Sequence, residues 1–353
     1  MPDKEQVLRC AQDDTRSALQ ANFTTMLIIN HQDVERVFTM PTAIDVMRDA
    51  LLSLDRGDAV QPMRMAMPLP ADRGIVWIMP AVAGTPASPG LKALSAYPGN
   101  HGTAFDTHQG AVLLFGDHGE LLALVDATAL TATRTAAVSA VATGALARPD
   151  ATGLAILGSG SQAMAHVEAM TCVRPISHVR VWSRTAANAE HFARAVRERF
   201  AVAVVACESV QAAVDGADII CTTTGAQRAI LAGRMVQAGT HINAVGSGSP
   251  AARELDGEVL RSARVFVDRT DCALREAGDI ILAIADGLFA AGDIAGDLGA
   301  VLAARVVGRS TPAEITVFKS VGLAVEDVAA ARSTYDACRR LGLGREIPFG
   351  TAS

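Results

Sequence analysis

The spacing of apolar residues divides the chain into two parts. In the first part, the apolar run MLII (26–29) precedes the helical periodicity of PTAIDVMRDALLSLDRG (41–57). Residues 60–126 then carry short β-type runs, namely RMAMPL, IVWIMPAVA, LKALSAY, AVLLF and ELLALVD. The segment GDHG (116–119) between the last two runs predicts a hairpin. A buried helix is predicted over RTAAVSAVATGALAR (134–148), which ends before Pro149.

The second part alternates buried strands with helical segments. It opens with GLAILGSGSQAMAHVEAM (153–170), which predicts a strand, a glycine-rich turn and a helix. Further short apolar runs follow, with helical segments such as TAANAEHFARAVRERF between them: HVRVWSR, AVAVVACES, ADIICTTT, THINAVGS and RVFVD. This alternation is typical of a doubly wound parallel sheet.

The patterns together predict an α/β protein with two domains. We expect a Rossmann-type domain over residues 149–311 and an α+β domain over residues 26–148 and 312–353. The tail ITVFKSVGLAVEDVAAARSTYDACRRLG (315–342) predicts a strand, a turn and a helix that return to the first domain. Residues 1–25 are polar and aperiodic, so we expect a loosely attached extension there.

Composition narrows the class of protein. Half of the 353 residues are apolar, 4% are aromatic, and the net charge of −6 comes without a basic block, which argues against nucleic acid as a partner. No apolar run reaches membrane length, and no targeting segment is evident. The six cysteines are scattered without CxxC pairs, so neither a disulfide framework nor a structural zinc is expected. A cytoplasmic enzyme fits this profile.

The glycine-rich turn predicts a dinucleotide site. Gly158, Gly160 and Ala163 fit G-x-G-x-x-A directly after a strand and at the start of a helix, where backbone N–H groups can bind a pyrophosphate. At the end of the next strand, where NAD-binding sites usually carry an acid, the chain has Ser183, Arg184 and Thr185. This favours NADPH over NADH. A helix N-cap with an exposed Arg184 is the alternative interpretation.

The distribution of lysine raises a question about GLKALSAYPGN (90–100). Only Lys4, Lys92 and Lys319 among the 31 basic residues are lysines. An exposed cation could be either residue, whereas a site that needs a compact ammonium with an adjustable pKa requires lysine. Lys92 is therefore a candidate for chemistry.

Long, ordered motifs carry a family resemblance. DTHQGAVLLFGDHGELLALVDATALTATRTAAVSAVATGALAR (106–148), GSGSQA with WSRT, INAVGSGSPAARELD (242–256) and KSVGLAVED (319–327) resemble the ornithine cyclodeaminase/mu-crystallin family. The resemblance spans the chain from about Met26 to the C-terminus. It implies a homodimer in which the first domain binds substrate and mediates dimerisation, and an activity on small α-amino or α-imino acids with a nicotinamide cofactor.

The resemblance also implies roles for individual residues. Arg64 and Lys92 match the family's substrate-binding arginine and active-site lysine, and Arg134 matches an arginine between the substrate carboxylate and the nicotinamide. The remaining matches lie around the cofactor, with Val321 also beside the substrate: Thr107, His108, Ser161, Gln162, Thr223, Thr224, Val245, Gly246, Ser320 and Val321.

These roles fit the chemistry of an imino acid. An arginine fork is the natural partner of its carboxylate, and a lysine ammonium can polarise or protonate the imine nitrogen. Structural alternatives remain for each residue: a surface ion pair for Arg64, a helix-start contact for Arg134, a snorkelling strand residue for Lys92 and a structural hydrogen bond for His108.

One departure from the family pattern favours reduction. Cyclodeaminases and alanine dehydrogenases of the family carry an aspartate at the fourth position of VGSG, where this chain has Gly248. Starting from an amine requires such a base, whereas reducing an existing imine does not, so the hypothesis requires no carboxylate beside the cations. The chain thus resembles the ketimine reductase and mu-crystallin branch. The expected reaction is reduction of Δ1-pyrroline-2-carboxylate to L-proline or of Δ1-piperideine-2-carboxylate to L-pipecolate.

Other functions stay open. A linear imino acid could be the substrate, and an amino-acid dehydrogenase is a related alternative. An ornithine cyclodeaminase would release ammonia from ornithine without net change of cofactor. A mu-crystallin-like protein that sequesters NADPH or another ligand is the alternative from outside enzymology.

Overall fold

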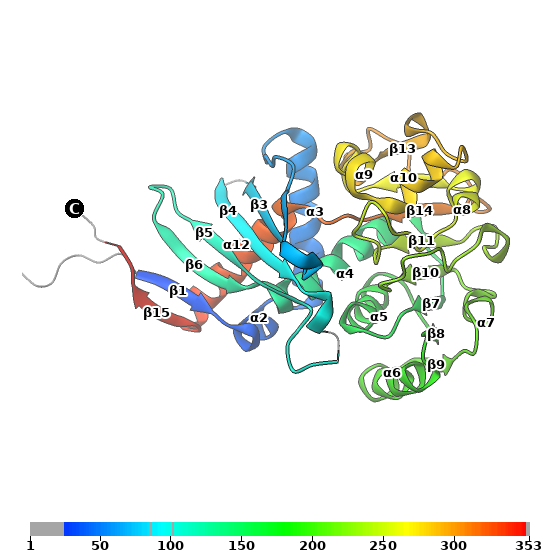
Figure 1. Ribbon diagram of the computed structural model, residues 1–353, viewed down its shortest axis with the longest axis horizontal. Coiled ribbons are helices and arrows are strands. Elements are labelled where there is room, and N and C mark those ends of the chain that lie inside the picture. The colour runs from blue at the N-terminus through cyan, green and yellow to red at the C-terminus, as the bar shows by residue number, and fades with distance from the viewer. Residues whose placement is uncertain (1–24, 85–86, 101, 351–353) are drawn as a thin grey trace, which may run out of the picture.

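The computed structural model describes residues 25–84, 87–100 and 102–350. Within these residues the chain forms two sheets that lie side by side, with helix α4 (Ala127–Leu146) between them (Figure 1). The expected extension over residues 1–25 falls outside the described residues except for Thr25, which begins the first strand.

The first domain is built on a mixed seven-stranded sheet with the order β15-β1-β6-β5-β4-β3-β2. Only β1 and β6 pair in parallel; the other neighbours are antiparallel. The strands are β1 (Thr25–Ile29), β2 (Met65–Pro68), β3 (Ile75–Ala83), β4 (Ser88–Ala96), β5 (His108–Phe115), β6 (Leu121–Asp126) and β15 (Arg345–Pro348). The expected strands of this region are confirmed, and so is the hairpin at 116–119, which joins β5 and β6.

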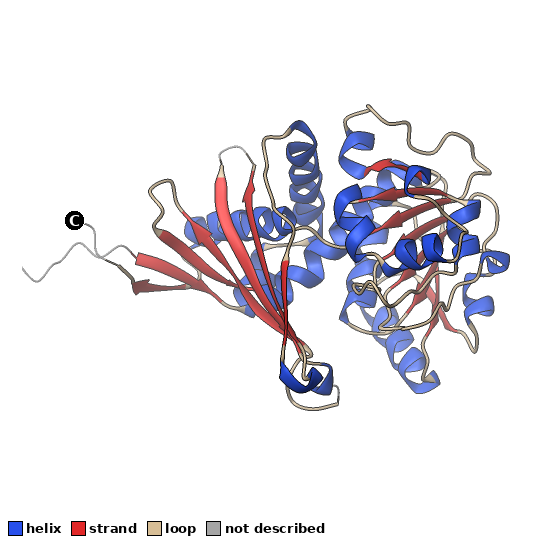
Figure 2. Ribbon diagram, turned by 45° about the horizontal axis from the view of Figure 1, so that its top comes forward, coloured by secondary structure: helices blue, strands red, loops and turns tan. Residues whose placement is uncertain are grey.

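Helices cover one face of this sheet (Figure 2). They are α2 (His31–Val37), α3 (Met40–Arg56), α4 and α12 (Ala324–Leu341), with short 3-10 turns η1 (Pro70–Asp72) and η2 (Pro98–Asn100) at the edges. Helix α4 begins seven residues before the predicted start at Arg134. Asp126 explains the difference, because its carboxylate caps the helix by accepting the backbone N–H groups of Thr128 and Ala129.

The second domain is a parallel sheet of eight strands, with the order β13-β12-β14-β11-β10-β7-β8-β9 within the described residues. Its strands are β7 (Gly153–Leu157), β8 (His178–Trp182), β9 (Ala203–Ala206), β10 (Ile219–Thr222), β11 (His241–Ala244), β12 (Arg264–Val267), β13 (Ile294–Asp297) and β14 (Thr316–Lys319). The strand order reverses between β7 and β10. Open α/β sheets bind ligands at the carboxyl ends of the strands at such a switch point.

The connections of the second domain are mostly helical. They comprise α5 (Ser161–Val173), α6 (Ala186–Arg199), α7 (Val210–Val214), η3 (Gly233–Met235), α8 (Gly257–Ser262), α9 (Thr270–Glu276), α10 (Gly278–Ala285), η4 (Ala291–Asp293) and α11 (Leu298–Leu302). The predicted doubly wound sheet and the helix after the glycine turn are confirmed.

We expected the chain to return to the first domain at residue 312, and this prediction is wrong for strand β14. β14 (Thr316–Lys319) pairs in parallel with β11 and β12 and is therefore part of the second sheet. All four of its residues are buried, as expected of a central strand that is covered on both faces. The chain returns only after Lys319, when α12 crosses the first sheet and β15 joins its edge (Figure 1).

Candidate active site

Lys92 lies in the middle of β4 and points toward the helices. Its side chain is 1% exposed, and its ammonium donates to Thr131 Oγ1 at 2.8 Å and to Asp327 Oδ1 at 3.0 Å. Burial lowers the pKa of Lys92 to about 8, with Asp327 acting against that shift and Arg134 and Arg64 adding to it. Such an ammonium is acidic enough to give up a proton near neutral pH.

Arg134 comes from α4 and meets the same carboxylate. Its Nε donates to Asp327 Oδ1 at 2.9 Å and its Nη1 to Glu326 Oε2 at 2.8 Å. The guanidinium is buried, and Gly322 passes directly beside it, because a Cβ built on Gly322 would lie 2.9 Å from Nη1 of Arg134. The guanidinium of Arg134 therefore contacts the start of α12 and lies beside the loop that precedes this helix.

Arg64 reaches this loop from the other side. Its Nη2 donates to the carbonyls of Val321 at 2.9 Å and Gly322 at 2.7 Å, and it lies 2.7 Å from Glu276 Oε2. The side chain is 20% exposed. Arg64 is therefore no surface ion pair. It contacts the loop at Gly322, which also lies beside Arg134, and its charge acts on Lys92.

Glu326 and Asp327, at the start of α12, are the site residues that the sequence analysis did not select. Both are fully buried, and one oxygen of each, Glu326 Oε1 and Asp327 Oδ2, has no hydrogen-bond partner among the described residues. Burial raises the pKa of Glu326 to about 7. Burial also opposes ionisation of Asp327, but the charges of Arg134 and Lys92 outweigh it and lower its pKa. Carboxylates therefore do lie beside the cations, contrary to the simplest form of the hypothesis.

Asp268 anchors the loop between β14 and α12. It follows β12, and its Oδ2 accepts the backbone N–H groups of Val321 at 2.7 Å and Gly322 at 2.8 Å, with Ser320 Oγ at 3.4 Å. The second domain thereby positions the two carbonyls that Arg64 of the first domain contacts. The loop is one of the places at which the two domains meet.

The glycine turn has the features of a phosphate cradle. Gly158 has φ +126°, and a Cβ there would lie 2.7 Å from the carbonyl oxygen of Thr223, so only glycine fits. Gly160 is the N-cap of α5 without a side-chain hydrogen bond, and no atom lies within 4 Å of where its Cβ would be. Near Ser161, the Oε1 atom of Gln162 is buried and has no hydrogen-bond partner in the part of the chain that the structure describes. Open space, free helix N–H groups and an unsatisfied polar atom suit a dinucleotide pyrophosphate.

The end of β8 offers polar groups beside this turn. Ser183 Oγ lies 2.9 Å from Ser159 Oγ, which ties the strand end to the glycine turn. Thr185 is the N-cap residue of α6, but its side chain makes no capping hydrogen bond. Arg184 is exposed and forms no hydrogen bond or ion pair with any residue that the structure describes. Arg184 and the hydroxyl of Thr185 are therefore available to contact a ligand.

Glu254 is a further functional candidate that the sequence analysis missed. This buried carboxylate accepts hydrogen bonds from Thr222 Oγ1, from the backbone and hydroxyl of Thr224, and from the backbone of Gly246, at 2.6–2.8 Å. It therefore ties together the loops after β10 and β11, which carry Thr223, Thr224, Val245 and Gly246. Its position in ARELD, beyond the quoted VGSG motif, is the signal that could have pointed to it.

Lys319, at the end of β14, supports the loop after β11. It is fully buried, donates to the carbonyl of Ser247 at 2.9 Å and lies 3.1 Å from Asp279 Oδ2. Asp279 in turn accepts the backbone N–H groups of Glu254 and Leu255. In contrast, Gly248 faces open space, since no atom lies within 4 Å of where its Cβ would be. No acid among the described residues takes the place of the family's aspartate there.

His108 and Thr107 lie at the start of β5, where Thr107 Oγ1 is 3.1 Å from His108 Nδ1. Partial burial and the positive charge of Lys92 lower the pKa of His108, so its imidazole is neutral at pH 7. The structure thus places the predicted residues in two adjoining groups. Arg64, Lys92, Arg134, Thr107 and His108 belong to the first domain, and the others lie at the carboxyl edge of the second sheet: Gly158, Gly160, Ser161, Gln162, Ser183, Arg184, Thr185, Thr223, Thr224, Val245, Gly246, Ser320 and Val321.

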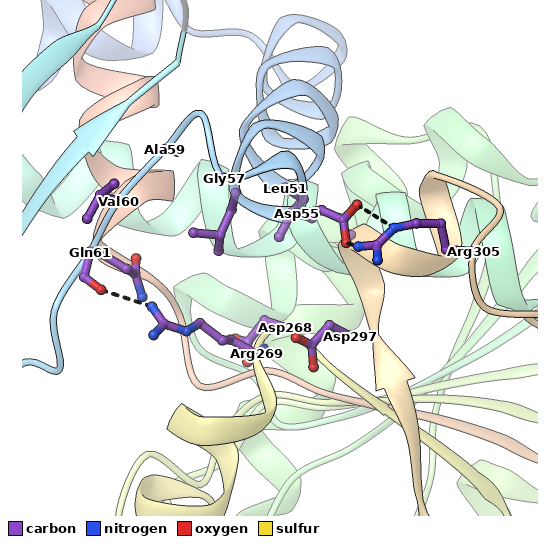
Figure 3. Close-up of a pocket in the computed structure, with 12 residues that line it drawn as sticks. Leu51, Asp55, Gly57, Ala59, Val60, Gln61, Asp268, Arg269, Asp297 and Arg305 are labelled. Carbon is purple, nitrogen blue, oxygen red and sulfur yellow. Dashed lines mark hydrogen bonds and ion pairs between the residues drawn. The ribbon is translucent and has the colours of Figure 1, made fainter.

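A cavity of about 420 Å³ lies elsewhere between the domains, beside α3 and the ends of β12 and β13 (Figure 3). Arg305 pairs with Asp55 across it, and Arg269 donates to the carbonyl of Gln61. Neither Lys92 nor the glycine turn lines this cavity. It is therefore a polar groove behind the interdomain loop and not the candidate active site.

The fold and the site define a dinucleotide-binding protein whose first domain presents cations to the carboxyl edge of the Rossmann-type sheet of the second domain. The family profile "Ornithine cyclodeaminase/mu-crystallin family" matches residues 24–341, and the chain belongs to this family. No helix within the described residues combines the length and the apolar character needed to cross a membrane.

Three relatives are similar to the chain over most of its length. The ketimine reductase mu-crystallin of Mus musculus is 44% identical over 284 residues, covering 79% of this chain and 86% of that protein. The Thermococcus litoralis Δ1-pyrroline-2-carboxylate reductase, solved with NADH and L-proline, superposes with a TM-score of 0.89 at 33% identity, covering 91% of this chain and all of that one. An archaeal alanine dehydrogenase dimer with bound NAD gives 0.87 at 29% identity, covering 93% and 100% of the two chains.

Proposed function

We propose that this protein is an NAD(P)H-dependent reductase of the C=N bond of a small α-imino acid, with Δ1-pyrroline-2-carboxylate and Δ1-piperideine-2-carboxylate as the leading substrates. The observation that carries the proposal is a buried lysine with a pKa of about 8 and two arginines, all next to the carboxyl edge of a sheet with a dinucleotide turn. Relatives that reduce ketimines and Δ1-pyrroline-2-carboxylate support it.

The residues divide the chemistry between them. Arg64 and Arg134 bind the substrate carboxylate, for which a guanidinium fork is suited. Lys92 donates a hydrogen bond, and then a proton, to the imine nitrogen. When bound, the reduced nicotinamide supplies the hydride for the imine carbon, so that one hydride and one proton convert C=N into CH–NH. The buried position of Lys92 excludes water from this transfer.

The Gly248 position separates this function from the amine-directed chemistry of the family. No carboxylate of the described residues lies within 4 Å of where a Cβ on Gly248 would be, so none of them stands there to deprotonate an ammonium or activate water. Asp327 is poorly suited to that role, because the charges of Arg134 and Lys92, which share its Oδ1, lower its pKa and make it a weak base. This observation favours a reductase over an ornithine cyclodeaminase or an amino-acid dehydrogenase.

NADPH is the proposed cofactor. Ser183, Arg184 and Thr185 stand at the end of β8, and the free guanidinium of Arg184 suits a 2′-phosphate, whereas an acid would repel it. The relatives solved with NADH and NAD make NADH the alternative. Comparing kcat/KM for the two reduced cofactors decides between them.

A homodimer is proposed from the first sheet. Its face opposite the helices carries an apolar row that crosses five neighbouring strands at one register: Ile28, Leu124, Leu113, Leu91 and Pro80. Within the described residues no helix packs on this face (Figure 2). An apolar row of this kind suits burial by a second copy. Leu113→Glu should yield monomers in light scattering, and an unchanged mass would contradict the proposal.

One experiment tests the activity directly. Oxidation of NADPH and of NADH is followed with the two cyclic imines, with pyruvate plus methylamine, and with ornithine. Lys92→Met should abolish turnover while leaving cofactor binding in place, because Met is nearly isosteric but cannot donate a proton. Ornithine-dependent ammonia release without net cofactor change would identify a cyclodeaminase. Tight cofactor binding with no turnover on any imine would identify a binding protein.

A further inference from the structure

Lys92 does not stand alone in its site, because a single oxygen of Asp327 connects it to Arg134. Asp327 Oδ1 accepts from the ammonium of Lys92 at 3.0 Å and from Nε of Arg134 at 2.9 Å. All three side chains are at least nine-tenths buried. One carboxylate oxygen therefore sets the separation and the direction of the two cations that the proposed function assigns to the imine nitrogen and the carboxylate.

We propose that Asp327 is the positioning residue of the reaction: it holds the Lys92 ammonium at a fixed distance from Arg134 and keeps it protonated until the imine nitrogen takes the proton. The inference deepens the proposed function and rests on it. Of the three N–H bonds of the ammonium, Asp327 and Thr131 take two, which leaves one to point at a substrate. Once that proton is transferred, the neutral amine still donates to Asp327.

The charges around Lys92 show why this carboxylate is needed. Arg134 of α4 and Arg64 of the segment before β2 both act on Lys92 as like charges and favour its neutral form, as burial does. His108 of β5 is neutral and adds no charge. Asp327 of α12 is the group whose charge and hydrogen bond favour the ammonium. Without it, the pKa of Lys92 would be lower and a smaller fraction of the proton donor would be protonated at neutral pH.

Glu326 offers a matched control on the next residue. It is as deeply buried as Asp327 and also pairs with Arg134, at 2.8 Å, but it makes no hydrogen bond to Lys92. Its remaining contact is the backbone N–H of Leu323. Replacing either carboxylate by its amide removes the same chemical group from the same helix turn, yet only Asp327→Asn removes it from the lysine.

The first measurement is the pH profile of kcat/KM for a cyclic imine with saturating NADPH. Activity requires protonated Lys92, so it should fall as the pH rises through about 8 in the wild type. We call this fall the alkaline limb of the profile. In Asp327→Asn the alkaline limb should move to lower pH by about one unit or more, because an opposite charge at contact distance from Lys92 has been lost. In Glu326→Gln kcat/KM should fall while the limb stays at the wild-type pH. Titration of the substrate itself is common to all variants and cancels.

The second measurement determines the titration midpoint of Lys92 directly and does not depend on turnover. Since the chain has only three lysines, protein labelled with ¹⁵N at lysine Nζ gives three side-chain signals, and Lys92→Met assigns one of them. The titration midpoint of that signal should fall in Asp327→Asn by the same shift as the kinetic limb. If the wild type reduces no imine, the proposed function fails, but this titration still decides the role of Asp327.

Two outcomes would overturn the inference. One is an Asp327→Asn protein whose pH limb and Lys92 midpoint both match the wild type while kcat drops, since that would mean a merely structural carboxylate. The other comes from Asp327→Glu, which keeps the charge and serves if the amide variant does not fold. It should keep the limb near pH 8 but lose kcat through misplacement of Lys92, and a wild-type kcat would refute positioning.

Discussion

Lys319→Met would test the buried ion pair beneath the cofactor loop. The substitution leaves Asp279 without its cation and the carbonyl of Ser247 without a donor, in a region where both partners of the pair are fully buried. Breaking such a pair from one side typically costs about 3–5 kcal/mol. Since Asp279 keeps its two backbone donors, it stays in place and the charge stays buried.

The expected loss is large on the scale of a domain. About 3–5 kcal/mol corresponds to a drop in Tm of roughly 6–20 °C for a unit of this size. The chain has one tryptophan in each sheet, Trp77 in β3 and Trp182 in β8. In a Trp77→Phe background, the fluorescence of Trp182 therefore follows unfolding of the second domain alone, in urea at pH 7.

A double variant isolates the cause. Lys319→Met combined with Asp279→Asn removes both charges, and replacement of a whole buried pair by neutral groups is often close to neutral. The double variant should therefore recover most of the lost stability. A single variant destabilised by less than about 1 kcal/mol, or a double variant no more stable than the single one, would refute the reasoning.

Three further substitutions probe the dinucleotide edge. Gly246→Ala places a Cβ 2.2 Å from the carbonyl oxygen of Thr224 and 2.6 Å from Glu254 Oε1. Cofactor affinity should therefore fall in a fluorescence titration, and the free energy of unfolding should drop by about 1–3 kcal/mol. Unchanged cofactor binding would contradict this prediction. Gly248→Asp has room, so stability should stay within about 0.5 kcal/mol of the wild type. Ornithine-dependent ammonia release should then become measurable, and its absence would show that a carboxylate there is not sufficient. Arg184→Asp should lower kcat/KM for NADPH by about 10- to 100-fold and leave NADH use nearly unchanged, whereas an equal loss with both cofactors would count against a 2′-phosphate contact.

Local patterns predicted most of the architecture because their causes are local. The period of apolar residues, the GDHG turn and the glycine turn depend on neighbours within a few positions, and the structure confirms the elements that they indicate. The start of α4 was predicted seven residues late because Thr128 and Thr131 weaken its helical pattern. Asp126, a good N-cap residue, was the local signal for the true start.

Long-range pairing explains the failures. β14 (Thr316–Lys319) is a short apolar run that belongs to the second sheet because it pairs with β11 and β12. Its own sequence does not indicate which of the two sheets it joins. Glu326 and Asp327 read as ordinary acids of a first helical turn, where they also suit the helix dipole. Their partners lie 192 and more residues away in the chain, so their burial could not be read from sequence periodicity.

The rarity of lysine in this chain indicated a functional residue, and the structure shows what that indication means physically. It pointed to Lys92 as a functional residue, yet the structure buries Lys319 equally well and also pairs it with an acid. Both lysines that the structure describes are buried beside a carboxylate, so the choice of lysine does not by itself separate a catalytic role from a structural one. Chemistry needs a further condition, which is an N–H bond left over for a ligand. Lys92 meets that condition between α4 and α12 of the first domain, while Lys319 supports the backbone of the loop that carries Ser247.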